Sequence, residues 1–360
     1  MLEDFLSNPT AQFVLFSTVK IIVVFAVVMT FVAYAVLVER KVSAAIQDRV
    51  GPNRTAPPLA LKIPFFGKLL QSWGMFQPMA DGLKFMLKED FTPSYVRTIY
   101  FWLAPAISVI PAFLTLAVIP FGSQLGGQKM VIADLDVGIL YTFGIVSLGV
   151  YGIVLAGWAS NSKYPFLGGI RASAQMISYE IAMGMSVVAV FLVVGDLNLS
   201  RVIEWQAKNG WLIIYQPLAF VIFLVAVFAE TNRLPFDLPE SETELVGGFH
   251  TEYSSMKFAL FFLGEYAAMI GASAMMVVLF FGGWSLPFFG TPASTLLGGL
   301  LHIGVFLGKM IVLMVVFIWV RWMLPRFRYD QLMDLGWRRF IPLALGNIVV
   351  TALVLALVER

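Results

Sequence analysis

The sequence contains eight long apolar stretches, and each is long enough to cross a lipid bilayer as a helix. They lie at about 14–38, 101–121, 138–159, 174–194, 212–230, 257–281, 299–320 and 340–358. A helix needs roughly 20 mostly apolar residues to span a hydrocarbon core of about 30 Å. Because 59% of the residues are hydrophobic, the chain resembles integral membrane proteins in composition. We predict an all-α polytopic membrane domain over residues 1–360, with eight transmembrane helices.

A short amphipathic helix is predicted between the first and second of these stretches, in QPMADGLKFMLKED at 77–90. Met79, Leu83 and Met86 fall on one helical face, whereas Lys84 lies away from it. This pattern predicts a helix lying in the plane of the membrane interface. The residues before it contain three prolines at 57, 58 and 64, so they cannot form a continuous membrane-spanning helix.

The distribution of Lys and Arg predicts the orientation of the chain. The segments at about 39–100, 160–173, 231–256 and 321–339 would share one side of the membrane and hold 17 of these residues, against four on the other side. Positively charged loops face the cytoplasm, so both termini are expected outside. The start MLEDFLSNPT is acidic and lacks the positive region of a cleaved signal peptide, so the first helix is expected to be retained.

The composition also excludes several kinds of cofactor. The chain has no cysteine, so it cannot hold a thiolate-bound iron–sulfur cluster. Its two histidines, His250 and His302, are predicted on opposite membrane faces, which argues against a bis-histidine haem. No glycine-rich nucleotide fingerprint follows a strand pattern. If the protein takes part in electron transfer, another subunit must carry the electrons.

One predicted cytoplasmic loop, AETNRLPFDLPESETELVGGFHTEYSS at 229–255, is unusually acidic. Arg233 is its only fixed positive charge, and its acids are Glu230, Asp237, Glu240, Glu242, Glu244 and Glu252. A helix-capping pattern beginning at Ser241 accounts structurally for Glu242 and Glu244. The other acids have no such account, and like charges this dense repel one another unless some are protonated or paired.

Three charged residues, Glu180, Glu265 and Lys309, lie inside the predicted membrane helices. Such a charge costs roughly 2.5–3.5 kcal/mol at the centre of a spanning helix and is retained for pairing or for a transport pathway. Structural pairing with a neighbour is one interpretation. Proton handling is the other, and the acidic loop beside two of these residues favours it.

Several motifs together resemble a known family, the quinone-pocket membrane subunits of respiratory complex I, the proton-pumping NADH-quinone oxidoreductase. The motifs are VERK at 38–41, RVGPN at 49–53, QPMAD at 77–81, GWASNSKY at 157–164, SAQMISYE at 173–180, AETNRLPFDLPESETELVGGF at 229–249 and LPRFRYDQLM at 324–333. They occur in order over nearly the whole chain. The long acidic motif is too irregular to recur by chance, so the resemblance is specific.

The resemblance implies a protein whose cytoplasmic loops wall a quinone cavity. Quinone would be the substrate, and the chain itself would bind no metal, haem or iron–sulfur cluster. The implied partners are the peripheral iron–sulfur and quinone-site subunits, small membrane subunits, antiporter-like subunits and the lipid bilayer, with no nucleic acid. The implied location is the inner (plasma) membrane of a bacterium.

The same resemblance assigns roles to matching residues but no catalytic residue in the strict sense. For the quinone cavity it implies Glu39, Arg40, Arg49, Asp81, Glu230, Arg233 and Asp237. For proton transfer it implies Glu180, Glu230, Glu240, Glu242, Glu244, Glu252, Glu265 and Lys309. Two features depart from the family: the segment at 53–77 is longer than usual, and His250 stands where another polar residue is expected.

Three other functions remain possible from the sequence. The homologous membrane subunit of a hydrogenase or formate hydrogenlyase would share the fold but use no quinone. A secondary transporter would show internal repeats with interrupted helices, and no such symmetry is visible. A passive membrane anchor would leave the intramembrane acids unexplained.

Overall fold

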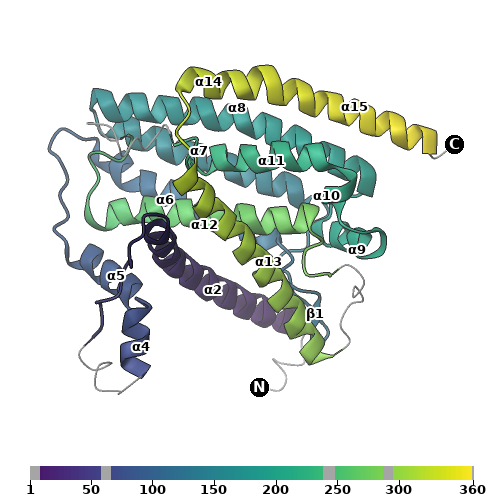
Figure 1. Ribbon diagram of the computed structural model, residues 1–360, viewed down its shortest axis with the longest axis horizontal. Coiled ribbons are helices and arrows are strands. Elements are labelled where there is room, and N and C mark those ends of the chain that lie inside the picture. Colours follow the sequence, from purple (N-terminus) through teal and green to yellow (C-terminus); the bar gives the residue numbers. More distant parts are fainter. Residues whose placement is uncertain (1–8, 58–65, 238–247, 287–294, 359–360) are drawn as a thin grey trace.

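The structure is a computed structural model, and it describes residues 9–57, 66–237, 248–286 and 295–358. The described residues form a bundle that consists almost entirely of helices (Figure 1). In chain order the elements are α2 (Pro9–Ile46), α4 (Phe66–Ser72), α5 (Gln77–Leu87), α6 (Thr98–Leu114), the 3₁₀ helix η1 (Thr115–Val118), β1 (Gln124–Leu125), β2 (Gln128–Lys129), α7 (Gly138–Ala159), α8 (Lys163–Val194), α9 (Leu199–Asn209), α10 (Leu212–Tyr215), α11 (Pro217–Glu230), α12 (Ser255–Phe280), α13 (Leu296–Met323), α14 (Tyr329–Asp334), the π-helix η2 (Leu335–Phe340) and α15 (Ile341–Val358).

Seven helical segments of the described chain are long and apolar enough to cross a membrane. They coincide with seven of the eight predicted stretches, so the helices predicted there are confirmed. The predicted start of the fourth helix was too late, because α8 begins at Lys163 and takes in most of the segment assigned to the 160–173 loop. Hydropathy locates only the apolar part of a helix, and the backbone ladder can continue beyond it into polar sequence.

The fifth apolar stretch, 212–230, is not one continuous helix, contrary to the prediction. It consists of the four-residue α10 and the 14-residue α11, which begins at Pro217. Proline lacks an N–H and disfavours helical geometry in the residue before it, and Gln216 accordingly has φ −132°. The Gln216 side chain donates to Thr351 Oγ1 at 2.8 Å and accepts from Asn347 at 2.9 Å. The break is therefore held against α15 by hydrogen bonds.

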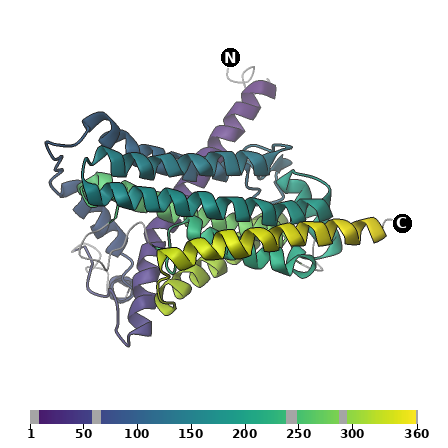
Figure 2. The ribbon, with the colours of Figure 1, turned by 90° about the horizontal axis from the view of Figure 1, so that it is seen from above.

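Helix α12 lies at the centre of the bundle. Its apolar window is 72% buried, against 11% for the last spanning segment, which contains α15. Helices α6, α7 and α8 pack side by side, α11 and α15 pack on α8, and α12 packs on α6, while the N-terminal half of α2 stands apart from the rest (Figure 2). Gly152 permits the close approach of α7 to α6, because a Cβ there would meet the backbone of Ser108 at 2.6 Å.

The two ends of the bundle differ in structure. Helices α4 and α5 lie toward one end, whereas α9 and the short β1–β2 hairpin lie toward the other (Figure 1). The predicted short helix at 77–90 is present as α5. Its apolar side chains are exposed, with Met86 68% and Leu87 85% accessible.

Candidate functional site

A buried group of charged side chains centres on Arg233, in the turn that follows α11. Asn232 begins the turn with a left-handed φ of 51°, a conformation that asparagine tolerates better than most residues. Gln175 on α8 holds the turn, because its Nε2 donates to the carbonyl oxygens of Ala229 and Phe236, each at 2.8 Å. The turn thereby directs the arginine into the bundle, where its side chain is 0% exposed.

Arg233 joins two carboxylates from different helices. Its Nη1 donates to Glu39 Oε2 on α2 at 2.7 Å, and its Nε forms a close ion pair with Glu265 on α12. The guanidinium also stacks over the ring of Tyr266, with Cζ 4.3 Å from the centroid. These contacts supply the pairing that a buried charge requires, because an isolated ion would lose its hydration without compensation.

Glu39 has two further partners. The hydroxyl of Tyr266 donates to Oε2 at 2.6 Å, and Arg321 at the end of α13 contacts Oε1 at 2.6 Å. The Arg233 cluster, which we define as Glu39, Arg233, Glu265, Tyr266 and Arg321, therefore joins α2, α12, α13 and the turn after α11.

A large cavity lies on one side of this cluster. Its volume is about 980 Å³, and it is formed by α2, the 49–52 segment, α5, α12 and the end of α13. Much of the wall is apolar, with side chains such as Met29, Val32 and Phe262, and the polar lining residues include Glu39, Arg40, Arg49, Asp81, Tyr266 and Arg321. Such a space suits a ligand with a polar head and a long apolar part.

A smaller cavity of about 130 Å³ lies on the other side, among α6, α7, α8, α11 and α12, and Glu230 and Glu265 line it. Both carboxylate oxygens of Glu230 are buried, and neither has a hydrogen-bond partner among the described residues. Glu180 is near enough for its like charge to act on Glu230. A carboxyl group in such surroundings can hold a proton and release it when nearby charge changes.

Arg233 lies between the two cavities. One of its partners, Glu39, lines the large cavity, and the other, Glu265, lines the small one. A change in charge at either carboxylate would alter the field at the other through the shared guanidinium.

The structure separates the sequence-predicted cavity residues into three groups. Glu39, Arg40, Arg49 and Asp81 line the large cavity, and Glu230 lines the small one. Arg233 lies between them. Asp237 is buried and pairs with Arg326 at 3.1 Å.

The predicted proton-transfer residues are not all brought together. Glu180, Glu230 and Glu265 lie near the small cavity, whereas Glu252 accepts a hydrogen bond of 2.7 Å from Tyr95 outside the bundle. That bond raises the pKa of the Tyr95 hydroxyl above its ordinary value. Glu240, Glu242 and Glu244, with the proposed capping pattern, lie outside the described residues.

Lys309 lies apart from the acids, at the far end of α12. Its Nζ donates to the carbonyl oxygens of Phe281, Gly283 and Ser285 at 2.7, 3.0 and 2.5 Å, and it lies 5.2 Å from the ring centroid of Trp211. Carbonyl groups at a helix C-terminus carry partial negative charge, so they stabilise a cation. This geometry matches structural pairing, the other interpretation of an intramembrane charge.

The sequence interpretation missed two members of the cluster, Tyr266 and Arg321. Arg321 was assigned to an aromatic and positively charged belt at the membrane surface, but only 12% of its side chain is exposed. A signal was available, because Met310, Met314 and Phe317 are buried on the same face of α13 at the spacing that brings residue 321 to it. Tyr266 directly follows Glu265, and no feature of the sequence marked its hydroxyl as a partner for Glu39.

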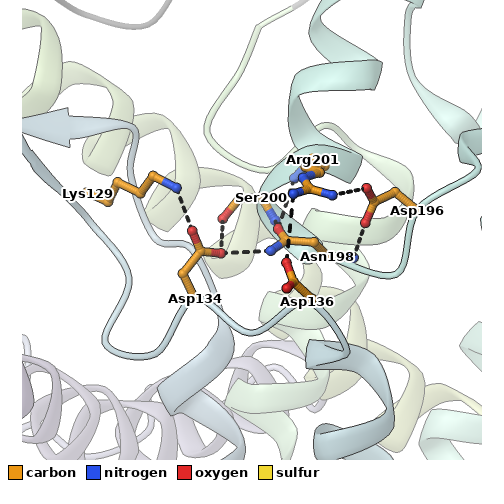
Figure 3. Close-up of polar contacts among 7 residues, drawn as sticks. All are labelled: Lys129, Asp134, Asp136, Asp196, Asn198, Ser200 and Arg201. Atoms are coloured by element: carbon orange, nitrogen blue, oxygen red, sulfur yellow. Dashed lines mark hydrogen bonds and ion pairs between the residues drawn. The ribbon is translucent and has the colours of Figure 1, made fainter.

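A second polar network lies at the opposite end of the bundle (Figure 3). Asp134, in the connection to α7, accepts hydrogen bonds from Lys129 at 2.6 Å, Asn198 at 3.0 Å and Ser200 at 3.2 Å. Partial burial disfavours ionisation of Asp134, but these donors outweigh it and hold its pKa below the ordinary value. Arg201 pairs with Asp196 at 2.5 Å. The network attaches the hairpin segment to the start of α9.

The fold and the site together define a polytopic membrane protein in which a buried arginine and several acids connect two cavities. A model of the NADH dehydrogenase family matches residues 19–352. The chain belongs to that family.

Individual relatives are similar over almost their full length, and all three named here are H subunits of NADH-quinone oxidoreductase. The chain is 46% identical to the relative from Cytophaga hutchinsonii, covering 94% of this chain and 96% of the relative. It is 45% identical to the relative from Flavobacterium johnsoniae, covering 96% of each. Identity to the relative from Leptospira biflexa is 48%, over 90% of each chain.

Proposed function

We propose that this chain is the quinone-cavity membrane subunit of a proton-pumping NADH-quinone oxidoreductase, respiratory complex I. The relatives named for that enzyme support the assignment. The observation that carries it is the continuous contact from Glu39 in the large cavity, through Arg233, to Glu265 in the small one. Such a contact gives a route by which a charge change beside a bound quinone can influence acids inside the membrane.

The large cavity is the proposed quinone site. Its volume and mixed lining suit a polar headgroup near the Arg233 cluster and an apolar tail directed toward Arg40 and Asp81. Reduction of a quinone consumes two electrons and two protons. The electrons would come from a neighbouring subunit, and the lack of cysteine here supports that division of labour. The chain is proposed to bind no metal, haem or iron–sulfur cluster.

The proton route is proposed to run through Glu180, Glu230 and Glu265, with Glu240, Glu242, Glu244 and Glu252 forming its cytoplasmic acidic approach. The unpartnered, buried carboxylate of Glu230 and its proximity to Glu180 support coupled titration of these acids. Lys309 also remains a predicted member of the route, although its three carbonyl contacts favour a structural role.

The proposed membrane arrangement has eight crossings. Seven are the long helices, and the eighth is the broken pair α10 and α11, whose 14-residue second part is too short to span alone. The termini would face outward, α5 would lie in the interface, and the segments near 39–100, 160–173, 231–256 and 321–339 would be cytoplasmic. Partners would be the peripheral quinone-site subunits and the small and antiporter-like membrane subunits, in a bacterial inner membrane.

Quinone binding is tested by photo-crosslinking with an azido-quinone in native membranes. Adducts on this chain near 40–54 or Asp81, removed by competing quinone, are expected. A chain free of adducts, when other quinone proteins in the same membranes are labelled, would favour the hydrogenase-type relative instead.

The proton route is tested by Glu180→Gln, which removes the charge with little change in shape. We expect quinone reduction to continue with impaired pumping. Normal pumping in that variant would refute the proposed route.

A further inference from the structure

The mouth of the large cavity is bordered by residues from separate parts of the chain. Arg40 comes from the last turns of α2, Gly51 and Pro52 come from the segment that follows, and Asp81 comes from α5. Arg40 and Asp81 face each other across this border, with Nη1 2.8 Å from Oδ2.

The ion pair alone holds this border weakly. Its side chains are 45% and 24% exposed, respectively, and exposed ion pairs contribute little because water screens them. In addition, Asp81 Oδ2 makes no aligned hydrogen bond with any described residue, although Arg40 lies close to it. The position of the carboxylate must therefore depend on another contact.

Gln77 supplies that contact. Its Nε2 donates to Asp81 Oδ1 at 3.0 Å, one helical turn along α5. The other end of its amide, Oε1, accepts a hydrogen bond of 2.5 Å from the hydroxyl of Thr55. Because both ends of the amide are engaged, the Thr55 hydroxyl fixes which end faces Asp81.

The segment that carries Thr55 is itself supported from behind. Lys41 Nζ donates to the carbonyl oxygens of Val50 at 3.3 Å and Ser72 at 3.4 Å, and Gln71 donates to that of Arg54 at 3.0 Å. Gln71 and Ser72, at the end of α4, thus hold the 50–55 segment in place, although they do not themselves line the cavity. The rim network, which we define as Thr55, Gln77, Asp81 and Arg40, consequently connects three elements across the mouth.

We propose that Gln77 is a positioning residue that holds Asp81 toward Arg40, and that the rim network thereby selects quinones with long tails. The proposal rests on the quinone function proposed above. With the headgroup near Glu39 and Tyr266, a long tail must pass the rim and remain in contact with it. A short tail ends inside the cavity, so it gains nothing from the rim.

The test uses the assembled complex with Thr55→Val, Gln77→Leu and the double variant. Thr18→Val is the matched control, because Thr18 lies in the other half of α2 and its hydroxyl bonds only Val14 within its own helix among the described residues. NADH-driven reduction is measured with two quinones that share a headgroup, one with a single isoprene unit and one with the native long tail.

Each single variant is expected to raise KM for the long-tail quinone roughly threefold to tenfold, the effect of one lost hydrogen bond. KM for the short-tail quinone should change by less than about twofold, and Thr18→Val should leave both unchanged. The double variant should be no worse than Gln77→Leu, because the Thr55 hydroxyl acts through Gln77.

Equal changes in KM for both tails, additive effects in the double variant, or no change in either would overturn the proposal. If Gln77→Leu fails to assemble, Thr55→Val with its control decides the question alone. Azido-quinone labelling of the wild-type complex separates the two levels. Labelling that persists while the variants show no tail dependence refutes only the rim network, whereas unlabelled wild-type chain refutes the quinone function itself.

Discussion

Replacement of Arg233 by glutamine tests whether the buried cluster is held together by its central charge. The side chain is 0% exposed and contacts Glu39 and Glu265. Removing one partner from a buried ion pair costs roughly 3–5 kcal/mol, because the remaining charge is left uncompensated. Arg321 still contacts Glu39 at 2.6 Å, so the uncompensated charge is chiefly that of Glu265.

The loss should appear as a lower unfolding temperature of the detergent-solubilised complex, followed by circular dichroism. In a chain of this size 1 kcal/mol corresponds to roughly 2 °C, so the expected shift is roughly 6–10 °C. Arg49→Gln is the matched control, because Arg49 is exposed, and it should alter the free energy of unfolding by less than about 0.5 kcal/mol.

A double-mutant cycle makes the reasoning refutable. Glu265→Gln removes the carboxylate that Arg233→Gln leaves uncompensated, so the double variant should be more stable than the sum of the two single effects. A coupling of roughly 1–3 kcal/mol is expected for residues in one buried network. Additive effects, or an Arg233→Gln variant as stable as Arg49→Gln, would show that the cluster does not depend on this charge.

Three further predictions follow from other contacts. Tyr266→Phe removes the hydroxyl that donates to Glu39 at 2.6 Å and should lower the free energy of unfolding by roughly 1.5–3 kcal/mol; an unchanged unfolding curve in denaturant would contradict it. The Asp134–Lys129 pair has an acid with lowered pKa and a lysine with raised pKa. Its contribution, below about 1 kcal/mol because the pair is largely exposed, should be present at neutral pH. It should be lost as pH falls below the ordinary aspartate value of 3.8 and as pH rises above the ordinary lysine value of 10.5. Comparing wild type with Asp134→Asn across pH measures it, and a stability difference that persists at pH extremes would refute the assignment. Lys309→Gln should reduce stability by roughly 1.5–3 kcal/mol through lost bonds to carbonyl oxygens while quinone-linked proton uptake in proteoliposomes continues; abolished uptake with intact stability would instead support a relay role.

The helices could be read from the sequence because a membrane helix satisfies its own backbone hydrogen bonds. Local composition therefore predicts it without knowledge of its neighbours. The exception is the 212–230 stretch, where average hydropathy concealed the interruption at Pro217. The early start of α8 at Lys163 was missed for a related reason, since hydropathy registers the apolar length of a helix and not its full length.

The membership of the site was only partly readable. Glu39 and Arg40 are adjacent and were both assigned to the quinone cavity, yet Glu39 is 5% exposed within the Arg233 cluster and Arg40 lies at the rim. Successive residues on a helix point about 100° apart, so their surroundings depend on what packs against each face. The sequence carries no direct record of those neighbours.

By itself, then, the sequence determined the helical membrane class, the approximate positions of seven helices and the identity of most of the buried acids. Each of these follows from local composition, or from the cost of placing a charge in hydrocarbon. Only the tertiary structure decided that Arg233 connects Glu39 with Glu265, that Arg321 joins them and that Lys309 caps the end of α12. These pairs are far apart along the chain, and a charged group selects its partner by distance in space after the helices have packed.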